Sequence, residues 1–335
     1  MTLVLLDEPP ADTASSAATD MPESRTEVAI AACTVDRPDG LRQLLDGLAS
    51  LTFTRVVEPR ITVVIIDTAT TPSAQSIVDQ YHERLRWPII YRHEPRRGLV
   101  HARNAQLETA PWTADWIAMI DDDEVPVPEW LDALLATAFA HDAPLVAGPV
   151  VPAFVESPPR WAVDGRFFEV GPFVDGAPIG FLYTGNALVS LRTVRKAGWQ
   201  FEMAFNHSGG EDEHFFTRAL QAGLKAVSAA DARVYETIPA NRMTARWVMR
   251  RYFRMGTTLA AIDRLGHTHP GPLVRRALKG LLRMGLGVVT MTGVVAKGRL
   301  ALIKGLSGVA RGAGALAGVV GVRYGEYRPD RRESR

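Results

Sequence analysis

The sequence is poor in cysteine and in long apolar runs. Its 335 residues include a single cysteine, Cys33, so no disulfide can form within the chain and a reducing compartment is expected. No uninterrupted run reaches the roughly 20 apolar residues that a transmembrane helix needs. Residues 1–25 also lack the basic start and the long apolar segment of a signal peptide. Their Ala, Ser, Thr, Pro and Asp content predicts a disordered leader instead.

Net charge is nearly absent, but the two signs are separated along the chain. The composition, 47% hydrophobic and 22% charged, is that of a globular protein with a formal charge of +1. From Arg242 onward there are 19 Lys and Arg but four Asp and Glu, a net charge of +15 that leaves −14 on the rest. The basic region is expected to meet a polyanion or an anionic membrane. Nucleic acid is not the expected partner, because the cations alternate with Gly, Val and Leu rather than with stacking aromatics.

Short apolar runs alternate with helical patterns across residues 26–242. The runs at 28–33 and 61–67 have the β-branched, apolar content of strands buried on both faces, and further strands are predicted at 88–94 and 115–121. Between the first two, leucines recur at the helical spacing i, i+3, i+4, i+7 (Leu41, Leu44, Leu45, Leu48). This alternation predicts an α/β domain with a mostly parallel central sheet. Ligands of such sheets bind beyond the carboxyl ends of the strands.

Four consecutive carboxylates, Asp121, Asp122, Asp123 and Glu124, stand at the end of the predicted strand 115–121. Like charges this close repel, and some take up protons unless a counter-charge relieves them. A divalent cation would do so, and Mg²⁺ or Mn²⁺ takes few protein carboxylates and completes its shell with phosphate oxygens. The run therefore predicts a metal-dependent site for a nucleotide ligand. The alternative is a solvated acidic turn with one helix-capping aspartate.

A second acidic group, Glu211, Asp212 and Glu213, follows two glycines at a predicted helix start. Acids at a helix N-terminus are stabilised by its dipole and free N–H groups, so capping is one explanation. The two glycines also let the backbone approach a ligand closely. The preceding segment, residues 150–208, is irregular and rich in aromatics, which is typical of a lid or binding segment.

Six segments taken in order resemble the GT-A-fold glycosyltransferases of family 2, over roughly residues 26–256. They are VAIAACTVDRP, VVIIDTAT, RRGLVHARNAQLETA, IDDDEVPVPEWL, YTGNALVSLRTVRKAGWQFEMAF and GGEDEHFFTRALQAG. Within the family, EPRRGLVHARN and RRYFRMG are most similar to bacterial enzymes that build exopolysaccharides of the succinoglycan type. The resemblance implies an α/β GT-A fold and an inverting hexosyltransferase that depends on Mg²⁺ or Mn²⁺. The implied donor is a nucleotide-sugar, UDP-glucose as the first expectation, and the implied acceptor is a saccharide.

The resemblance assigns donor-binding roles to five residues. Asp67 would accept hydrogen bonds from the nucleobase, with Thr34 and Arg37 nearby. Arg103 would contact the diphosphate or the base, and Asp121 the ribose. A strand-end cap at Asp67 and an exposed helix arginine at position 103 are the alternatives.

The resemblance likewise implies the metal ligands. Asp123 is expected to bind the cation directly, whereas Asp122 is expected to face solvent and the role of Glu124 stays open. Glu236 stands where many relatives have a histidine, and glutamate can also ligate Mg²⁺ or Mn²⁺. It is a second candidate ligand, unless that ligand is simply lost in this chain.

Asp212 is expected to be the general base that deprotonates the acceptor hydroxyl, opposite the leaving nucleoside diphosphate. Glu211 and His214 would position the acceptor or hold Asp212, unless they are plain helix surface. Asn186 is also assigned to the acceptor site.

Residues 243–335 are predicted to be a basic, apolar, helical region. Its apolar runs at 284–296 and 312–322 favour helices lying in a membrane interface with cations toward anionic headgroups. Two sets of cations are predicted to share helical faces: Arg275, Arg276, Lys279 and Arg283, and Lys297, Lys304 and Arg311. A buried helical hairpin or a dimer interface is the alternative. We expect a protein peripheral to the cytoplasmic face of the plasma membrane, where a lipid-linked saccharide acceptor would lie.

Two other functions compete with sugar transfer. A nucleotidyltransferase would need a basic glycine-rich phosphate loop near the first strand, where CTVDRPDG offers only Arg37. A non-catalytic, membrane-bound scaffold with the same fold is disfavoured by the intact Asp123 and Asp212. Glu236 is the only feature in its favour.

Overall fold

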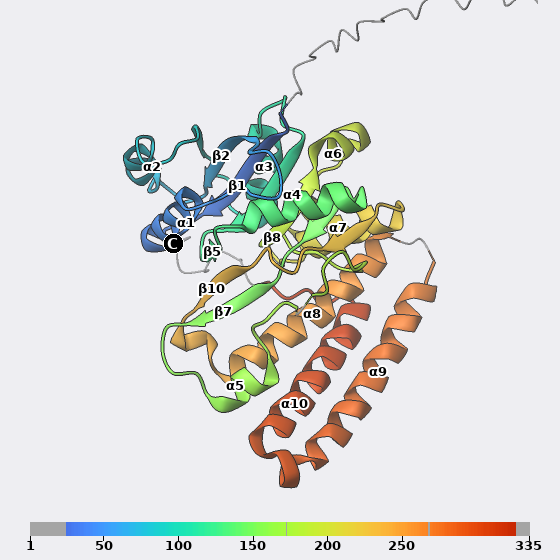
Figure 1. The fold of residues 1–335 in the computed structure, drawn as a ribbon. Coiled ribbons are helices and arrows are strands. Elements are labelled where there is room, and N and C mark those ends of the chain that lie inside the picture. Colours follow the sequence, from blue (N-terminus) through green and yellow to red (C-terminus); the bar gives the residue numbers. More distant parts are fainter. Residues whose placement is uncertain (1–24, 172, 267–268, 326–335) are drawn as a thin grey trace, which may run out of the picture.

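The computed structural model describes residues 25–325 except 172 and 267–268, so all but the last residue of the predicted leader 1–25 lies outside the described residues. Strands and helices alternate through the first part of the chain, and three long helices follow (Figure 1). The predicted α/β class is confirmed.

A seven-stranded sheet forms the centre of the α/β part. In sheet order its strands are β3 (Ile89–His93), β2 (Arg60–Asp67), β1 (Glu27–Thr34), β4 (Trp116–Asp121), β8 (Asn186–Ser190), β6 (Leu145–Ala147) and β9 (Ala226–Ser228). β8 runs antiparallel to β4 and β6, and the other pairs are parallel. The sheet is mostly parallel, as the alternation of runs predicts.

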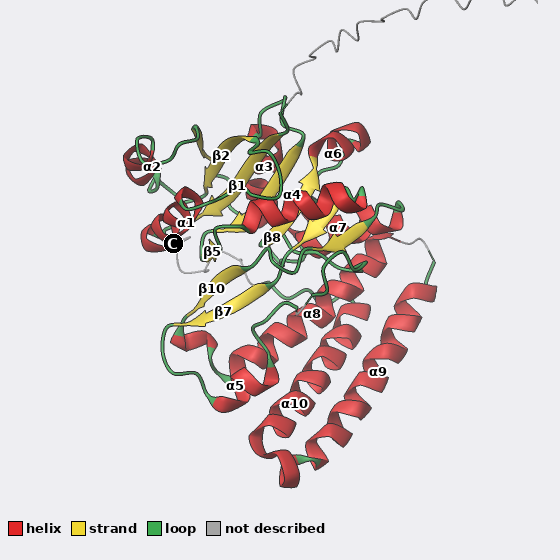
Figure 2. Cartoon of the chain, in the orientation of Figure 1, coloured by secondary structure: helices red, strands yellow, loops and turns green. Residues whose placement is uncertain are grey.

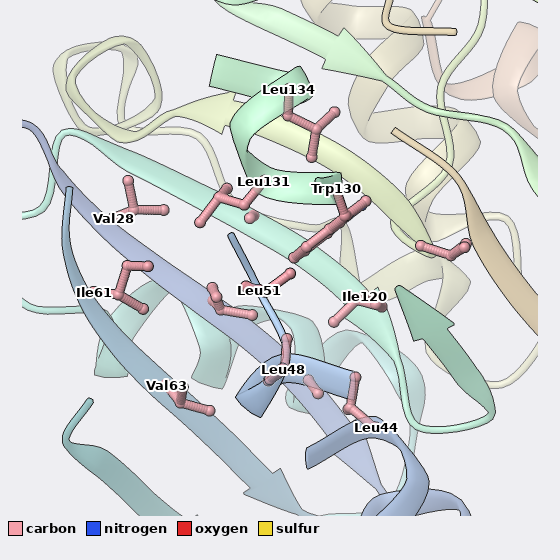
Figure 3. Close-up of a cluster of buried hydrophobic side chains, with 14 of the residues drawn as sticks. Val28, Leu44, Leu48, Leu51, Ile61, Val63, Ile120, Trp130, Leu131 and Leu134 are labelled. Carbon is pink, nitrogen blue, oxygen red and sulfur yellow. The ribbon is translucent and has the colours of Figure 1, made fainter. Parts of the chain in front are cut away.

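Helices cover both faces of this sheet because alternate strand residues point to opposite sides. Val28, Ile30 and Ala32 pack with the leucines of α1, with α2 and with α4, as Figure 3 shows in part. Ala29 and Ala31 pack on the other side with α3, α6 and α7. The bounds of these helices are α1 Pro38–Ala49, α2 Gln75–Tyr81, α3 Leu99–Thr109, α4 Trp130–His141, α6 Leu191–Ala197 and α7 Glu211–Gln221.

A second, three-stranded sheet lies beside the carboxyl end of β4. β10 (Val234–Ile238) pairs antiparallel with β5 (Glu124–Pro126) and parallel with β7 (Val150–Phe154). The two sheets are separate in Figure 2. Because β5 begins three residues after β4 ends, the acidic run is the link between the sheets.

The aromatics of the 150–208 segment are largely core, which differs from the expected lid. Trp161 and Phe167, in and after α5 (Arg160–Gly165), are buried together with Phe168, Val248 and Ile303. Ring stacking of Phe168 on Trp247, with centroids 5.5 Å apart, joins this segment to α8. The segment thereby packs the C-terminal helices against the small sheet. Two short 3₁₀ helices, Met203–Phe205 and Ala240–Arg242, complete the connections.

The predicted domain boundary at 242/243 therefore falls within a shared core. α8 (Ala245–Gly266), α9 (Gly271–Thr292) and α10 (Val294–Val319) form a bundle in which α10 lies between the other two (Figure 1). One described helix, Gly298–Val319, could cross a membrane by length and composition, with a mean hydropathy of 1.2 in its most apolar window. The predicted short apolar runs therefore do not delimit the helices, because α10 includes Lys304 and Arg311.

Glycines allow the three helix backbones to approach one another closely. A Cβ at Gly314 of α10 would overlap the carbonyl oxygen of Phe253 in α8, and one at Gly256 of α8 would overlap that of Arg311. On the other side of α10, a Cβ at Gly312 would lie 2.5 Å from the oxygen of Gly280 in α9. Such small-residue contacts are a common way to pack helices tightly.

Gly314→Ala is expected to destabilise the protein by about 1–3 kcal/mol, because overpacking forces backbones apart. Gly285→Ala is the matched control on α9, where an added Cβ meets no atom within 4 Å. Helix propensity should make that control neutral or stabilising by up to about 1 kcal/mol. Thermal unfolding of both variants measures the difference, and an unchanged melting temperature for Gly314→Ala would contradict the close packing.

Candidate active site

The carboxyl ends of neighbouring strands bring the predicted residues to one edge of the main sheet. Thr34 of β1 is in register with Asp67 of β2, and Cys33 with Asp121 of β4. The acidic run continues from this edge into β5. The edge of the sheet is therefore lined by carboxylates and by the loop that follows β1.

Asp122 is buried, with only 4% of its surface exposed, so the expectation that it faces solvent is wrong. Thr34 Oγ1 donates a hydrogen bond of 2.8 Å to Asp122 Oδ2, and Arg37 Nη1 donates one of 2.9 Å to Oδ1. Burial raises the pKa of Asp122 to about 6 although Arg37 opposes the shift. Asp122 thus ties the loop after β1 to the acidic run.

Two arginines hold the next carboxylates. Arg37 donates a second hydrogen bond, 3.0 Å long, to Asp123, and Arg242 lies 3.7 Å from the same carboxylate. Arg242 also donates to Glu236 at 3.0 Å. Burial and then Asp121 raise the pKa of Asp123. Sequence reasoning missed Arg242, because nothing in its local pattern distinguishes it from the other arginines that follow.

The pairing of β5 with β10 sets Glu124 directly opposite Glu236. Glu124 is buried and accepts a hydrogen bond from the backbone N–H of Asp121 at 2.9 Å. Burial, followed by the charge of Asp121, raises the pKa of Glu124 well above its ordinary value, and burial raises that of Glu236 to about 7. Repulsion between these two opposed carboxyl groups can be relieved by a bound cation or by a proton.

The oxygen donors of this edge suit a hard divalent cation in kind. Within the described ranges, however, no three His, Cys, Asp or Glu side chains converge as a metal-binding group. The arginines already pair with Asp123 and Glu236. A cation here would therefore need few protein ligands and several from its substrate, as Mg²⁺ and Mn²⁺ commonly have.

Arg103 lies beneath the acidic run, not on an exposed helix face. It is buried in α3 and donates a hydrogen bond of 2.6 Å from Nη2 to Asp121 Oδ1. Its Nε is buried without a hydrogen-bond partner among the described residues. The Asp121 carboxylate remains 39% exposed, so the pair presents a charged group to the crevice.

Asp67 acts as a cap at the end of β2, the alternative to base binding. Its side chain is fully buried and accepts hydrogen bonds from the N–H groups of Ala69 and Ala74 and from the hydroxyl of Tyr91, at 2.8–2.9 Å. These bonds shape the loop before α2. A cavity of about 300 Å³ lies beside that loop, lined by Thr34, Asp36, Arg37, Pro38, Leu41, Ser73, Ala74 and Ile77.

This cavity opens at the acidic edge of the sheet, since Thr34 and Arg37 belong to both. A larger cavity of about 510 Å³ lies at the opposite edge, near Glu27 and Arg60, where strands β1 and β2 begin. No residue of the acidic run lines it. The smaller cavity is therefore the better candidate for a ligand of the site.

The start of α7 supplies the second acidic group. Gly210 precedes it with φ +90° and packs against Thr258 of α8 so closely that a Cβ would overlap. Burial raises the pKa values of Glu211 and Asp212, which lie close enough to Arg103 and Asp121 for those charges to act on them. Asp212 is half-buried, and Glu211 is buried with Oε2 unpaired among the described residues.

His214 and Asn186 are less available to a ligand. The His214 ring is buried against Phe205 with centroids 5.0 Å apart, and burial lowers its pKa. The buried amide of Asn186 accepts from Trp130 Nε1 and donates to the carbonyl oxygens of Pro149 and Ala232. These bonds give Asn186 a structural part, and we leave it out of the proposed acceptor site.

Three aromatic rings lead toward Asp212. Phe173, Phe181 and Tyr183 form a row with centroid separations of 6.1 and 5.7 Å, and Phe181 is 45% exposed. Burial, and then the charges of Glu213 and Asp212, raise the pKa of Tyr183 to about 12. The row lies in the irregular segment whose aromatic content was recognised from sequence, but the sequence could not separate these rings from the buried ones.

Comparison with known proteins agrees with this arrangement. Residues 29–197 match the family model described as Glycosyl transferase family 2. The chain is 34% identical over 239 residues to the succinoglycan biosynthesis protein ExoM of Rhizobium meliloti (strain 1021), covering 71% of this chain and 75% of the relative. It is 25% identical over 218 residues to the glucosyl-dolichyl phosphate glucuronosyltransferase of Haloferax volcanii, covering 63% and 64%.

Solved structures share the fold. The mannosyltransferase PcManGT from Pyrobaculum calidifontis, in complex with GDP-Man and Mn²⁺, superposes with a TM-score of 0.55 at 18% identity. The match covers 87% of this chain and 88% of that chain. The fold is GT-A, as the sequence motifs imply.

Glu236→Gln is expected to stabilise the protein at pH 8 by about 1–3 kcal/mol. The pKa of Glu236 is raised from 4.5 to about 7, so ionisation of this group destabilises the folded state. The loss of stability begins as the pH rises above 4.5 and is complete above about pH 7. The neutral glutamine removes this cost, while Asp123 still accompanies Arg242. Thermal unfolding should show the gain at pH 8 and its disappearance toward pH 4.5. Glu83→Gln, on the exposed surface, is the control; an equal gain at both pH values would contradict the assignment.

Proposed function

The chain belongs to glycosyltransferase family 2, and we propose that it moves a hexose from a nucleoside diphosphate sugar to a saccharide acceptor with inversion. One observation carries this proposal. The half-buried carboxylate of Asp212 lies within electrostatic reach of Arg103 and Asp121, at the edge of the sheet that also holds Asp123. Inverting displacement requires a base on the acceptor side and stabilisation of negative charge on the leaving-group side, and Asp212 and the acidic run with its arginines offer these two sides.

The donor is proposed to bind between the loop after β1 and the acidic run. The cavity beside Thr34 and Ser73 would take the nucleoside, with Asp121 toward the ribose and Arg103 beneath it. Asp67 supports this cavity through its cap rather than by touching the base. UDP-glucose is the first donor to test, on family resemblance.

A divalent cation, Mg²⁺ or Mn²⁺, is proposed to be held by Asp123, with Glu236 as a second ligand, and would supply positive charge to the diphosphate leaving group. Arg37 and Arg242 occupy these carboxylates in the present structure. They would move from Asp123 and Glu236 to donor phosphate oxygens when the donor arrives. Both arginines would then neutralise charge that develops on the leaving group.

Asp212 is proposed to take the proton from the acceptor hydroxyl as that oxygen forms its bond to the anomeric carbon. The bond from this carbon to the donor phosphate oxygen breaks in the same displacement, and the nucleoside diphosphate leaves. The raised pKa of Asp212 makes it a stronger base than an ordinary aspartate. Glu211, beside it, would help to hold the acceptor, and the row ending at Tyr183 offers flat apolar surfaces to sugar rings.

We propose a lipid-linked acceptor and a place on the cytoplasmic membrane surface in polysaccharide synthesis. The name of the Rhizobium meliloti relative supports polysaccharide synthesis, and that of the Haloferax volcanii relative supports a lipid phosphate carrier. α9 supports membrane contact, because its outer face exposes a row of large apolar side chains: Val274, Leu278, Leu281, Leu282, Leu286, Val288 and Val289. The exposed cations Arg275 and Lys279 border this face and would meet anionic headgroups.

Isothermal titration of UDP and of GDP, with Mn²⁺ and then with EDTA, tests the donor site. One nucleotide is expected to bind only with metal. Binding should be lost in Asp123→Ala, which removes a cation ligand, and kept in Asp212→Asn, which alters the base alone. Equal binding to wild type and Asp123→Ala would contradict the assignment of the acidic run.

Sugar transfer by Asp212→Asn is expected to fall at least about 100-fold, because the general base is lost. The reaction is followed by release of nucleoside diphosphate from the donor. Glu83→Gln serves as the active control. Wild-type protein that binds the nucleotide but neither hydrolyses nor transfers the donor sugar would instead indicate a non-catalytic scaffold.

A further inference from the structure

Several guanidinium groups gather where α8, α9 and α10 cross. Arg276 of α9 binds Asp263 of α8 through two hydrogen bonds of 2.7 and 3.1 Å. Arg283 lies two helical turns further along the same face of α9. Arg311 of α10 lies at the level where Gly256 and Gly312 bring the backbones together. We call Arg276, Arg283 and Arg311 the arginine cluster.

Arg311 is partly buried and is not fully paired. It was expected on an exposed cationic face with Lys304, yet it is only partly exposed, and its Nε is buried with no hydrogen-bond partner in the described part of the chain. The neighbouring Lys304 is exposed, and the side chain of Lys297 lies outside the described residues. A buried guanidinium nitrogen without an acceptor is costly, which favours an anion at this place.

The positive charges of the arginine cluster repel one another, as the negative charges of the acidic run do. The pKa of Arg283 is lowered by burial and then by the like charges of Arg311 and Arg276. Asp263 already accepts hydrogen bonds from Nε and Nη2 of Arg276. Glu213 lies near Arg311 and Arg276, but no ion pair joins it to either among the described contacts. An anionic ligand would relieve this repulsion.

The arginine cluster lies near the start of α7, the helix that carries the proposed general base, because Arg311 and Arg276 act on Glu213. Gly210, just before α7, packs on Thr258 of α8. Two residues earlier in α8, Gly256 has no Cβ and so leaves room for the backbone of Arg311. Arg311 also acts on the pKa of Tyr183, as do Asp212 and Glu213. A group bound by the cluster would therefore lie close to the residues that surround Asp212.

We propose that the arginine cluster binds the phosphate of a lipid-phosphate-linked acceptor, an inference that rests on the proposed sugar transfer. The sugar would extend along Tyr183 toward Asp212, and the lipid would leave along the exposed apolar face of α9. Arginine suits this task because its planar fork matches phosphate oxygens. A bilayer headgroup is the less suitable occupant, because two of the three cluster members, Arg276 and Arg311, are only partly exposed, whereas Arg275 and Lys279 are exposed.

Titration of farnesyl diphosphate into the full chain in EDTA tests this site, with farnesol as the uncharged probe. Arg311→Gln and Arg283→Gln are expected to weaken binding of farnesyl diphosphate at least tenfold, whereas Arg275→Gln on exposed α9 should stay within twofold. Farnesol should bind wild type at least tenfold more weakly than its diphosphate. Arg283 is largely exposed, so its variant keeps the test valid if Arg311→Gln fails to fold.

Equal affinity of wild type and both cluster variants for farnesyl diphosphate would overturn the proposal, as would equal affinity for farnesol. The proposal would also be overturned if Arg311→Gln lost binding to phosphatidylglycerol vesicles and Arg275→Gln kept it. The cluster would then bind bilayer headgroups. Titration of UDP with Mn²⁺ into the same variants separates the two proposals. Unchanged UDP binding with lost farnesyl diphosphate binding supports the acceptor site, whereas absent UDP binding in wild type is a failure of the donor site alone.

Discussion

Neutralisation of crowded carboxylates by distant arginines is the interaction on which the acidic edge of the main sheet depends. The acidic run is bound by arginines from three different parts of the chain. Arg37 comes from the loop after β1, Arg103 from α3 and Arg242 from the segment after β10. Without them, burial and mutual repulsion would protonate these acids or separate the two sheets. The same pairs fix the positions of the carboxylates at the ends of the strands.

Much of this edge could be predicted from the sequence because its pattern is local. Buried strands, leucine spacing and consecutive acids placed Asp121 and Asp123 at a strand end, and the structure has them there. The partners of these residues could not be predicted, since Arg37 and Asp122 are 85 positions apart. Burial was the other unpredictable quantity. Asp67, Asn186 and Asp122 are all buried, and Asp67 and Asn186 bond to the protein itself. Their residue types alone would suit ligand binding equally well.

Part of the proposed acceptor site lies beyond the family match, whereas the aromatic row of Phe173, Phe181 and Tyr183 lies within it. The matched region ends at residue 197, whereas α7 and the three-helix bundle follow it. The buried aromatics around Trp161 connect that bundle to the small sheet, so the bundle and the small sheet share one packed interior. Close glycine contacts in the bundle fix the positions of its arginines relative to α7.

The cap formed by Asp67 has a consequence for how donor preference could change in evolution or in engineering. The loop beside the small cavity is held by backbone N–H groups bonded to one buried carboxylate, so its path is largely independent of its own side chains. Replacing exposed residues of that loop would leave its course intact and alter the cavity only at the surface. Insertions or deletions between residues 68 and 74 would reshape it at once, so loop length is the variable to vary in a library aimed at a different nucleotide.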